Sequence, residues 1–341
     1  MVVSSIPDDV IVTDYRTPTT TLPGWRQFVD ADPVTTTLPD RAGLDDDTRM
    51  AYDEERIRYH SELVVVATST VREVMRQGRL LTMLNQREIS ARRGLIVSGA
   101  WATGKSTAIK QLGRTHELLV RRRHPGEERI PVVYVTTPPK GSPRKLAAEF
   151  ARFLGLPTVK PRYNVTDIAD AVCQVLTDAR TDLVIVDEIH NLNLATSAGE
   201  DMSDHLKYFT EHLPATFVYS GINVESSGLF TGIRGKQIAG RCVMVRTGPF
   251  PFPFQQEWKG LVAALEDALR LHHHAPGSLV TLAKYLHQRT GGVISSLSHL
   301  VRASAISAIM DGTEKITRGI RLDHAAEDTA PQPARRKRPA S

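Results

Sequence analysis

Short apolar runs recur along the middle of the chain, and longer segments with helical periodicity lie between them. The runs are rich in Val and Ile and lack polar alternation, which is typical of strands covered on both faces in a parallel sheet. The predicted strands are 94–99, 131–137, 181–188, 215–221 and 241–247. The predicted helices between them are 105–123, 142–155, 165–180 and 200–213. This alternation predicts an α/β domain in which helices cover a parallel sheet.

Helical patterns also precede and follow this region. One begins at Thr48, after acidic residues suited to a helix N-terminus. A second, near 69–87, is expected to bury one face. The apolar residues of that face are Val71, Val74, Met75, Leu80 and Leu84. After the sequence TGPFPFPF (247–254) the strand signals stop. Three more helices then predict a small all-helical domain, near 255–271, 276–290 and 293–311.

Composition divides the chain into four segments. Residues 1–50 are acidic and rich in Thr and Pro. We expect them to be largely disordered, with Trp25 and Phe28 docking elsewhere on the molecule. Residues 51–250 are expected to form the α/β core, 251–322 a helical lid, and 323–341 a disordered basic tail. Residues 1–55 carry 12 acidic and 4 basic side chains, and the remainder carries 26 and 39. A basic body suits a polyanionic partner such as nucleic acid, although a solubilising surface would have the same charge.

Three features bear on where the protein works. No apolar run approaches the roughly 18 residues that a membrane span requires. The first ten residues, MVVSSIPDDV, have acids where a secretory signal would have basic residues. The two cysteines, Cys173 and Cys242, are too few for a disulfide framework and are expected to be buried thiols. We therefore expect a cytoplasmic protein with no membrane partner.

The stretch GAWATGKS, from Gly99 to Ser106, follows the first predicted strand and opens a helix. It fits the pattern G-x-x-x-x-G-K-[ST], whose backbone N–H groups surround phosphates at a helix N-terminus. Lys105 is expected to reach the β- and γ-phosphates, and Ser106 to hold Mg²⁺. The predicted nucleotide contacts are Gly99, Ala100, Trp101, Ala102, Thr103, Gly104, Lys105, Ser106 and Thr107.

The stretch LVIVDEIHNL supplies two carboxylates at the end of the third strand. Asp187 is expected to complete the Mg²⁺ site, and Glu188 to act as general base toward the attacking water. His190 follows directly, and it either contacts the site or packs in the interior. The two motifs in this order predict a nucleotide hydrolase.

Other catalytic candidates carry weaker signals. Ser220 or Asn223, after the fourth strand, is expected to orient the lytic water, although turn chemistry alone also favours these residues. Arg241, just before the fifth strand, is the first candidate for an arginine finger that reaches a neighbouring subunit's γ-phosphate. Arg234 is the second candidate. A surface ion pair would equally explain either arginine.

The loop TTPPKGSPRK (136–145) follows the second strand and carries cations and hydroxyl groups. Such groups make contacts to the phosphates of a duplex. The loop has no series of aromatic residues on which single-stranded bases would stack. The predicted duplex contacts are Thr137, Lys140, Ser142, Arg144 and Lys145. A solvated loop remains the alternative.

With both phosphate motifs, a polar residue after the fourth strand, an arginine before the fifth and a helical lid, the chain resembles the AAA+ ATPases. Over residues 52–312 it more closely resembles the TniB family, the ATPase subunits of transposition systems related to TnsC and MuB. The stretches that carry this resemblance are YHSELVVVATSTVREVM, RRGLIVSGAWATGKSTAIKQLGRTHE, VVYVTTPPKGSPRKL, ARFLGLP and DEIHNL.

The resemblance implies ATP and Mg²⁺ as cofactors and ATP-dependent oligomers that coat duplex DNA with little sequence preference. It also implies a DDE transposase as partner, hydrolysis that dismantles the oligomer, and a 136–145 loop that faces DNA. The sequence departs from the family at Ala102, where relatives commonly have Gly. It also has Ser295 and Ser296 where AAA+ proteins often have a sensor arginine, and Arg302 lies two helical turns later.

Two alternatives share the same core. A nucleotide-gated DNA scaffold would bind ATP but scarcely hydrolyse it. A replication initiator or helicase loader would usually append a winged helix, whereas only the polar residues 323–341 follow the lid here. We therefore expect the transposition ATPase.

Overall fold

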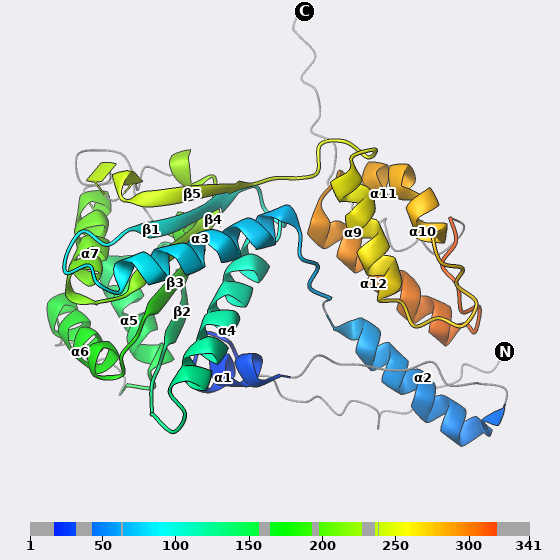
Figure 1. Cartoon of the computed structure of the whole chain (residues 1–341), viewed down its shortest axis with the longest axis horizontal. Helices are drawn as coiled ribbons and strands as arrows, with labels where there is room; N and C mark the ends of the chain where they lie inside the picture. The colour runs from blue at the N-terminus through cyan, green and yellow to red at the C-terminus, as the bar shows by residue number, and fades with distance from the viewer. Residues whose placement is uncertain are drawn as a thin grey trace, which may run out of the picture.

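The computed structural model describes residues 17–31, 43–62, 64–156, 164–192, 198–226, 236–237 and 239–318, with only the backbone for 198–203. The described residues form an α/β domain and a smaller helical domain beside it (Figure 1).

The α/β domain is built on a five-stranded parallel sheet in the order β2-β3-β4-β1-β5. The strands are β1 (Gly94–Gly99), β2 (Val132–Thr136), β3 (Leu183–Asp187), β4 (Thr216–Ile222) and β5 (Cys242–Thr247). The predicted parallel sheet is therefore confirmed. Because all strands run the same way, their carboxyl ends share one edge, where the loops of α/β proteins place their binding residues.

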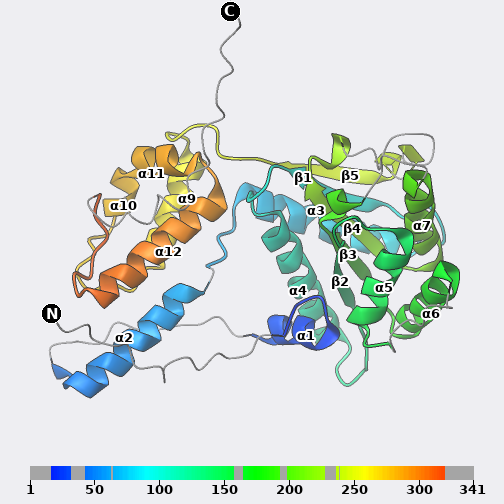
Figure 2. The ribbon, with the colours of Figure 1, turned by 180° about the vertical axis from the view of Figure 1, so that it is seen from behind.

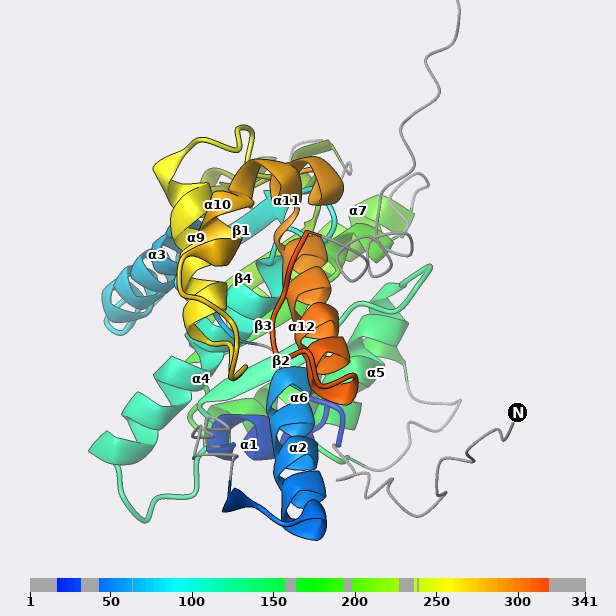
Figure 3. The same cartoon turned by 90° about the vertical axis from the view of Figure 1, so that its right-hand side faces the viewer.

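Helices cover both faces of the sheet. On one face lie α3 (Ser69–Asn85) and α4 (Lys105–Arg123). On the other lie α5 (Pro143–Phe153), α6 (Val165–Asp178) and α7 (Ala198–His212) (Figure 3). Strands β1 to β4 are thereby buried on both sides, as their sequences predicted, whereas the edge strand β5 is only partly buried.

The buried face of α3 differs from the prediction. Val74 is fully buried, but Leu80 and Leu84 are 45% and 56% exposed. The contact that sets the face involves Gly78, because a Cβ there would lie 2.3 Å from a methyl group of Leu112 on α4. The helix therefore approaches α4 along its glycine side, and the prediction for Leu80 and Leu84 is wrong.

The acidic N-terminal segment contains α1 (Leu22–Asp30), so the expectation of disorder is wrong for these residues. The Thr21 hydroxyl caps α1 by accepting the Gly24 N–H. Trp25 is fully buried against α4 and the sheet, and Phe28 packs partly against the same core. The prediction that these two aromatic residues dock is confirmed.

The helical domain has its own apolar core. Its helices are α9 (Gln256–Asp267), α10 (Ser278–Thr281), α11 (Ala283–Thr290) and α12 (Ile294–Met310). The helix predicted at 276–290 is thus two helices that meet at Leu282. In the described part of the chain, no single helix is long and apolar enough to cross a membrane. Only the pair α11 and α12 passes that test, across a bend of 115°, and both helices contribute to the apolar core.

Helix α2 (Asp46–Ser61) packs against α12 (Figures 1 and 2), although the sequence placed it with the α/β core. Arg56 explains this position. Its guanidinium is completely buried and donates two hydrogen bonds to the buried Glu314 carboxylate, at 2.7 and 2.8 Å. His60 accepts the Arg270 N–H, and burial lowers the pKa of His60 to about 4. Buried charged and polar groups therefore attach α2 to the helical domain.

The chain crosses between the domains at two neighbouring places. Residues 62–68 join α2 to α3, and 248–255 join β5 to α9. The two crossings are linked, because the Ser69 N–H donates to Glu257 Oε1 at 3.1 Å.

Candidate nucleotide-hydrolysis site

The turn between β1 and α4 has the backbone of a phosphate-binding loop. β1 ends at Gly99 and α4 begins at Lys105, so the predicted contact residues lie on this turn and the first turn of α4. Gly104 has φ +85°, and Ala102 has φ +58°. Ala102 therefore occupies a left-handed position that suits glycine, and its methyl group costs about 1–2 kcal/mol there. Lys105 Nζ donates to the carbonyls of Gly99 and Ala100, at 3.1 and 2.6 Å.

Gly99→Ala is expected to destabilise the protein by about 1–3 kcal/mol and to reduce nucleotide binding, because a Cβ there would lie 2.0 Å from the Thr247 carbonyl oxygen of β5. Denaturant unfolding and titration with a fluorescent ATP analogue measure both effects. Gly260→Ala on α9 is the control, since no atom lies within 4 Å of its added methyl group. A Gly99→Ala protein that matched this control would contradict the close contact between loop and β5.

The carboxyl end of β3 presents the two predicted carboxylates. Asp187 is only 2% exposed, and both of its oxygens accept hydrogen bonds. Tyr134 Oη donates to Oδ2 at 2.9 Å, and the Glu188 N–H donates to Oδ1 at 2.9 Å. Glu188 has φ +56° and a side chain that is 39% exposed. The turn therefore holds Asp187 in place and presents Glu188 to the solvent.

His190 contacts Glu188, which settles what the sequence left open. Its Nδ1 accepts the Ile222 N–H at 3.2 Å, so a neutral ring carries its proton on Nε2. Nε2 lies 3.3 Å from Glu188 Oε2. His190 Nε2 therefore faces the carboxylate of the expected general base.

The loop and the carboxylates meet at one edge of the sheet. Burial lowers the pKa of Lys105, while Glu188 and Asp187 oppose this shift through their negative charge. The Ser106 hydroxyl and Asp187 carboxylate are oxygen ligands of the kind Mg²⁺ prefers, and Mg²⁺ usually takes only one or two protein ligands besides phosphate oxygens and water. The residues present therefore fit a magnesium nucleotide.

The helical domain closes over this edge. The Ser295 N–H at the start of α12 donates to the Ala102 carbonyl at 3.3 Å. A small cavity of about 60 Å³ lies beside this contact, between the loop, residues 64–66 and α9. Arg302 does not face the loop, because its guanidinium donates to the carbonyls of His60 and Ser61 on α2. Arg302 therefore fastens α2 to α12 instead of replacing a sensor arginine.

The two candidates for orienting water differ in position. Ser220 lies inside β4, paired with Val97 of β1, and is completely buried. Its hydroxyl has no partner among the residues described. The prediction for Ser220 is therefore wrong, since it is not accessible to a lytic water. Asn223 follows β4 at the correct edge, is exposed, and its N–H donates to the Gly99 carbonyl at 3.4 Å.

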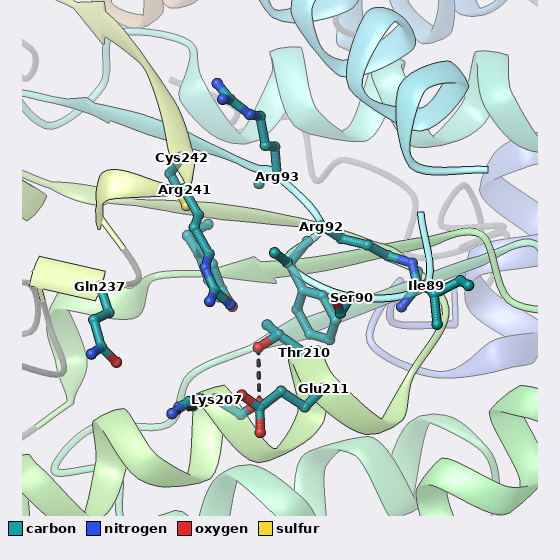
Figure 4. A pocket seen from close by; sticks show the side chains of 15 residues that line it. Ile89, Ser90, Arg92, Arg93, Lys207, Thr210, Glu211, Gln237, Arg241 and Cys242 are labelled. Atoms are coloured by element: carbon teal, nitrogen blue, oxygen red, sulfur yellow. Dashed lines mark hydrogen bonds and ion pairs between the residues drawn. The ribbon is translucent and has the colours of Figure 1, made fainter. Parts of the chain in front are cut away.

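Arg241 lies at the opposite edge of the sheet from the phosphate loop. It precedes β5 and lines a pocket of about 230 Å³ at the amino ends of β1, β4 and β5. Figure 4 shows its guanidinium pointing into this pocket, on the side of Lys207 and Glu211 from α7. It cannot reach the nucleotide of its own chain, so a role as arginine finger requires a neighbouring copy. Arg234 lies outside the described residues.

The 136–145 loop places its cations on the surface near the same edge as the phosphate loop. Lys140, Arg144 and Lys145 are exposed, and the Ser142 hydroxyl caps α5 by accepting the Lys145 N–H. Thr137 directly follows β2, donates its N–H to the Asp187 carbonyl of β3, and is only 1% exposed. The prediction that Thr137 contacts a duplex is therefore wrong.

The family assignment rests on the part of the chain that carries this site. The model of the bacterial TniB protein family matches residues 56–241. The chain belongs to the TniB family. No curated protein matches the sequence.

Solved structures identify the fold of this TniB-family chain. The ORC1 protein of Aeropyrum pernix in complex with DNA matches 79% of this chain and 67% of its own, with 18% identity and a TM-score of 0.60. The ADP form of ORC2 from the same organism matches 80% and 72%, with 17% identity and a TM-score of 0.61. Drosophila ORC bound to DNA matches 90% and 72%, with 13% identity and a TM-score of 0.52. These similarities show an AAA+ fold.

Proposed function

We propose that this TniB-family chain is an ATPase that assembles on duplex DNA, recruits or activates a DDE transposase, and releases the assembly through ATP hydrolysis. The observation that carries the proposal is that Lys105, Asp187 and Glu188 lie at the same carboxyl edge of the parallel sheet, where the helical domain contacts the phosphate loop. In this arrangement one end of the site binds phosphates, and the other supplies a base.

Each residue has a defined part in the proposed reaction. Lys105 would move from the loop carbonyls to the β- and γ-phosphates. Ser106 and, through water, Asp187 would hold Mg²⁺, which neutralises charge on these phosphates. Glu188, which His190 faces, would accept a proton from the attacking water. Asn223 would orient that water.

The assembly is proposed to need a second copy. Arg241 lies at the edge of the sheet remote from its own phosphate loop. This position is compatible with a residue that acts on the nucleotide of a neighbouring copy. The closing contact between Ser295 and Ala102 gives a route by which a nucleotide in the loop would change the position of the helical domain. Nucleotide binding would thereby control assembly.

DNA binding is assigned to the 136–145 loop. Replacing Lys140, Arg144 and Lys145 together with Ala is expected to weaken retention on duplex DNA. The slope of the log binding constant against log salt concentration should become shallower by about 3, since each phosphate contact releases condensed counterions. Retention is measured with ATP, ADP and no nucleotide across a salt series. The matched control removes three exposed arginines from or near α3, Arg72, Arg79 and Arg87.

The outcome separates the parts of the proposal. Equal salt slopes for the two triple variants would remove the loop from the DNA interface. A wild-type chain that stays monomeric and ignores DNA with every adenine nucleotide would overturn the assembly itself. The transposase role rests on family membership, and its test is ATP-dependent retention of an integrase-fold transposase on DNA coated with this protein.

A further inference from the structure

Tyr134 links the interior of the sheet to the magnesium-binding carboxylate. It lies in β2, is 3% exposed, and donates its hydroxyl proton to Asp187 Oδ2 at 2.9 Å. Burial and the Asp187 charge raise its pKa, so the hydroxyl keeps its proton and remains a donor. The hydroxyl therefore fixes the rotation of the Asp187 carboxylate and occupies a hydrogen-bonding position on its Oδ2 atom.

The Tyr134 ring is in turn packed against the N-terminal helix. Trp25 of α1 stacks on it, with ring centroids 5.7 Å apart and planes 13° from parallel. Lys110 Nζ of α4 lies 5.0 Å from the ring centroid. The Tyr134 side chain thus connects Trp25 of α1 to Asp187.

The site for Trp25 is built into α4. Gly113 lies in the middle of that helix, where glycine costs about 1 kcal/mol relative to alanine. A Cβ at Gly113 would lie 2.7 Å from Trp25 Cη2, so the missing side chain makes room for the indole. The indole N–H also donates to Glu117, a buried carboxylate of the same helix.

Further contacts hold the rest of α1 on α4. Arg121 bridges Glu117 and Asp30, while Arg114 donates to the carbonyls of Val29 and Ala31, at 3.1 and 2.8 Å. These polar contacts surround an apolar interface made by Trp25, the buried Val29 and the partly buried Phe28. Because α1 pairs with none of the five strands, its release would leave the hydrogen bonds of the sheet in place.

We propose that Tyr134 is a positioning residue for Asp187, and that docking of α1 controls magnesium binding through the stack of Trp25 on Tyr134. With α1 docked, Asp187 is held for Mg²⁺. With α1 released, the ring gains freedom and the carboxylate loses its fixed orientation. The inference rests on the proposed function, because it assumes that this site binds a magnesium nucleotide.

Carboxylates that bind metals are held by hydrogen-bonding partners, and removing one typically costs 10–100-fold in metal affinity or activity. Tyr134→Phe keeps the ring and its stacking but removes the donor. We expect it to raise the Mg²⁺ concentration for half-maximal binding of a non-hydrolysable ATP analogue by about 10-fold. Binding of the analogue in EDTA is expected to stay unchanged. Tyr208→Phe is the matched control, since it removes another tyrosine–aspartate hydrogen bond, with Asp170, on the outer helices.

Two full-length variants release α1 by different routes. Trp25→Ala removes the indole. Gly113→Ala crowds it, since the added Cβ would lie 2.7 Å from Trp25 Cη2, and this Cβ also approaches Ile185 Cδ1 of β3 at 3.0 Å. Both are expected to raise the half-maximal Mg²⁺ concentration, whereas Trp25→Phe keeps a stacked ring and restores most of the affinity. In a double-mutant cycle, Trp25→Ala should add nothing to Tyr134→Phe, because both act on the same carboxylate. Thermal unfolding of each variant checks that it is folded.

Three results would overturn the inference. One is an unchanged Mg²⁺ requirement in Tyr134→Phe, and another is a folded Gly113→Ala protein with wild-type Mg²⁺ binding. The third is full additivity in the cycle, which would mean that α1 acts by another route. If the wild-type protein shows no Mg²⁺-dependent binding of the analogue, the proposed function itself fails. These outcomes are therefore distinguishable.

Discussion

Glu188→Gln is expected to slow ATP hydrolysis by about 10²–10⁴-fold while ATP binding is retained. The glutamine amide has nearly the same shape, but it cannot take a proton from the attacking water. The phosphate loop is unchanged, so Lys105 still binds the nucleotide. Phosphate release under saturating ATP measures the rate, and titration with a fluorescent ATP analogue measures binding.

The control for this variant is Glu73→Gln. Glu73 lies on α3 in an exposed ion pair with Arg76. It should leave the hydrolysis rate unchanged. If the wild-type protein already hydrolyses no ATP, Glu188→Gln changes nothing. The protein would then be a nucleotide-gated DNA scaffold, and the ATPase proposal would be wrong.

Glu314→Gln is expected to lower the free energy of unfolding of the helical domain by about 3–5 kcal/mol. Both side chains of the Arg56–Glu314 pair are completely buried, and removing the Glu314 charge leaves the buried guanidinium with only the partly exposed Asp53 carboxylate as its charged partner among the described residues. Denaturant unfolding followed by circular dichroism measures the change. Loss of α2 from α12 should appear before the α/β domain unfolds.

The exposed Glu73–Arg76 ion pair provides the control for Glu314→Gln. Glu73→Gln should change the free energy of unfolding by less than about 0.5 kcal/mol, because solvent screens that charge. Replacing Arg56 with Met and Glu314 with Leu together should recover most of the loss, since neither completely buried charge of the pair then remains and Asp53, which loses its ion pair with Arg56, is 21% exposed. If Glu314→Gln were as mild as Glu73→Gln, the buried pair would not be what holds α2.

The sheet and the phosphate loop could be predicted because their signals are local. Each strand is a short, largely apolar run that contains Val, and each lies within one or two residues of its predicted range. The pattern of Gly99, Gly104 and Lys105 can be read from eight consecutive residues. The carboxylates follow from the same local logic, since Asp187 ends a buried strand.

What the sequence missed depends on distant partners. The acidic residues before Thr48 predict the start of a helix, but the sequence does not show that Arg56 in this helix pairs with a residue 258 positions away. Composition indicates disorder for the N-terminal segment, yet α1 docks through the Trp25 indole, the space at Gly113 and the hydrogen bonds of Arg114 and Arg121. Thr137 and Ser220 were misassigned because polar residues near strand ends need not face the solvent.

The two groups beside the carboxylates of the site carried only faint signals. Tyr134 lies in VVYVTT, where an aromatic residue is ordinary for a buried strand. Only its hydroxyl, in an otherwise aliphatic run, hinted at a polar partner. His190 lies close to Glu188 in sequence, but its orientation depends on the Ile222 N–H of another strand.

The paired crossings between the domains, joined by Ser69 and Glu257, have a mechanical consequence. A single linker would allow the helical domain to rotate in any direction, whereas two linkers joined side by side restrict it to rotation about one hinge axis. We expect the domain to rock toward and away from the phosphate loop without turning about its own length. One of the two linkers joins α2 to α3. Cutting the chain ahead of α3 would therefore remove one of the two hinge segments and also detach α2, which packs on the helical domain.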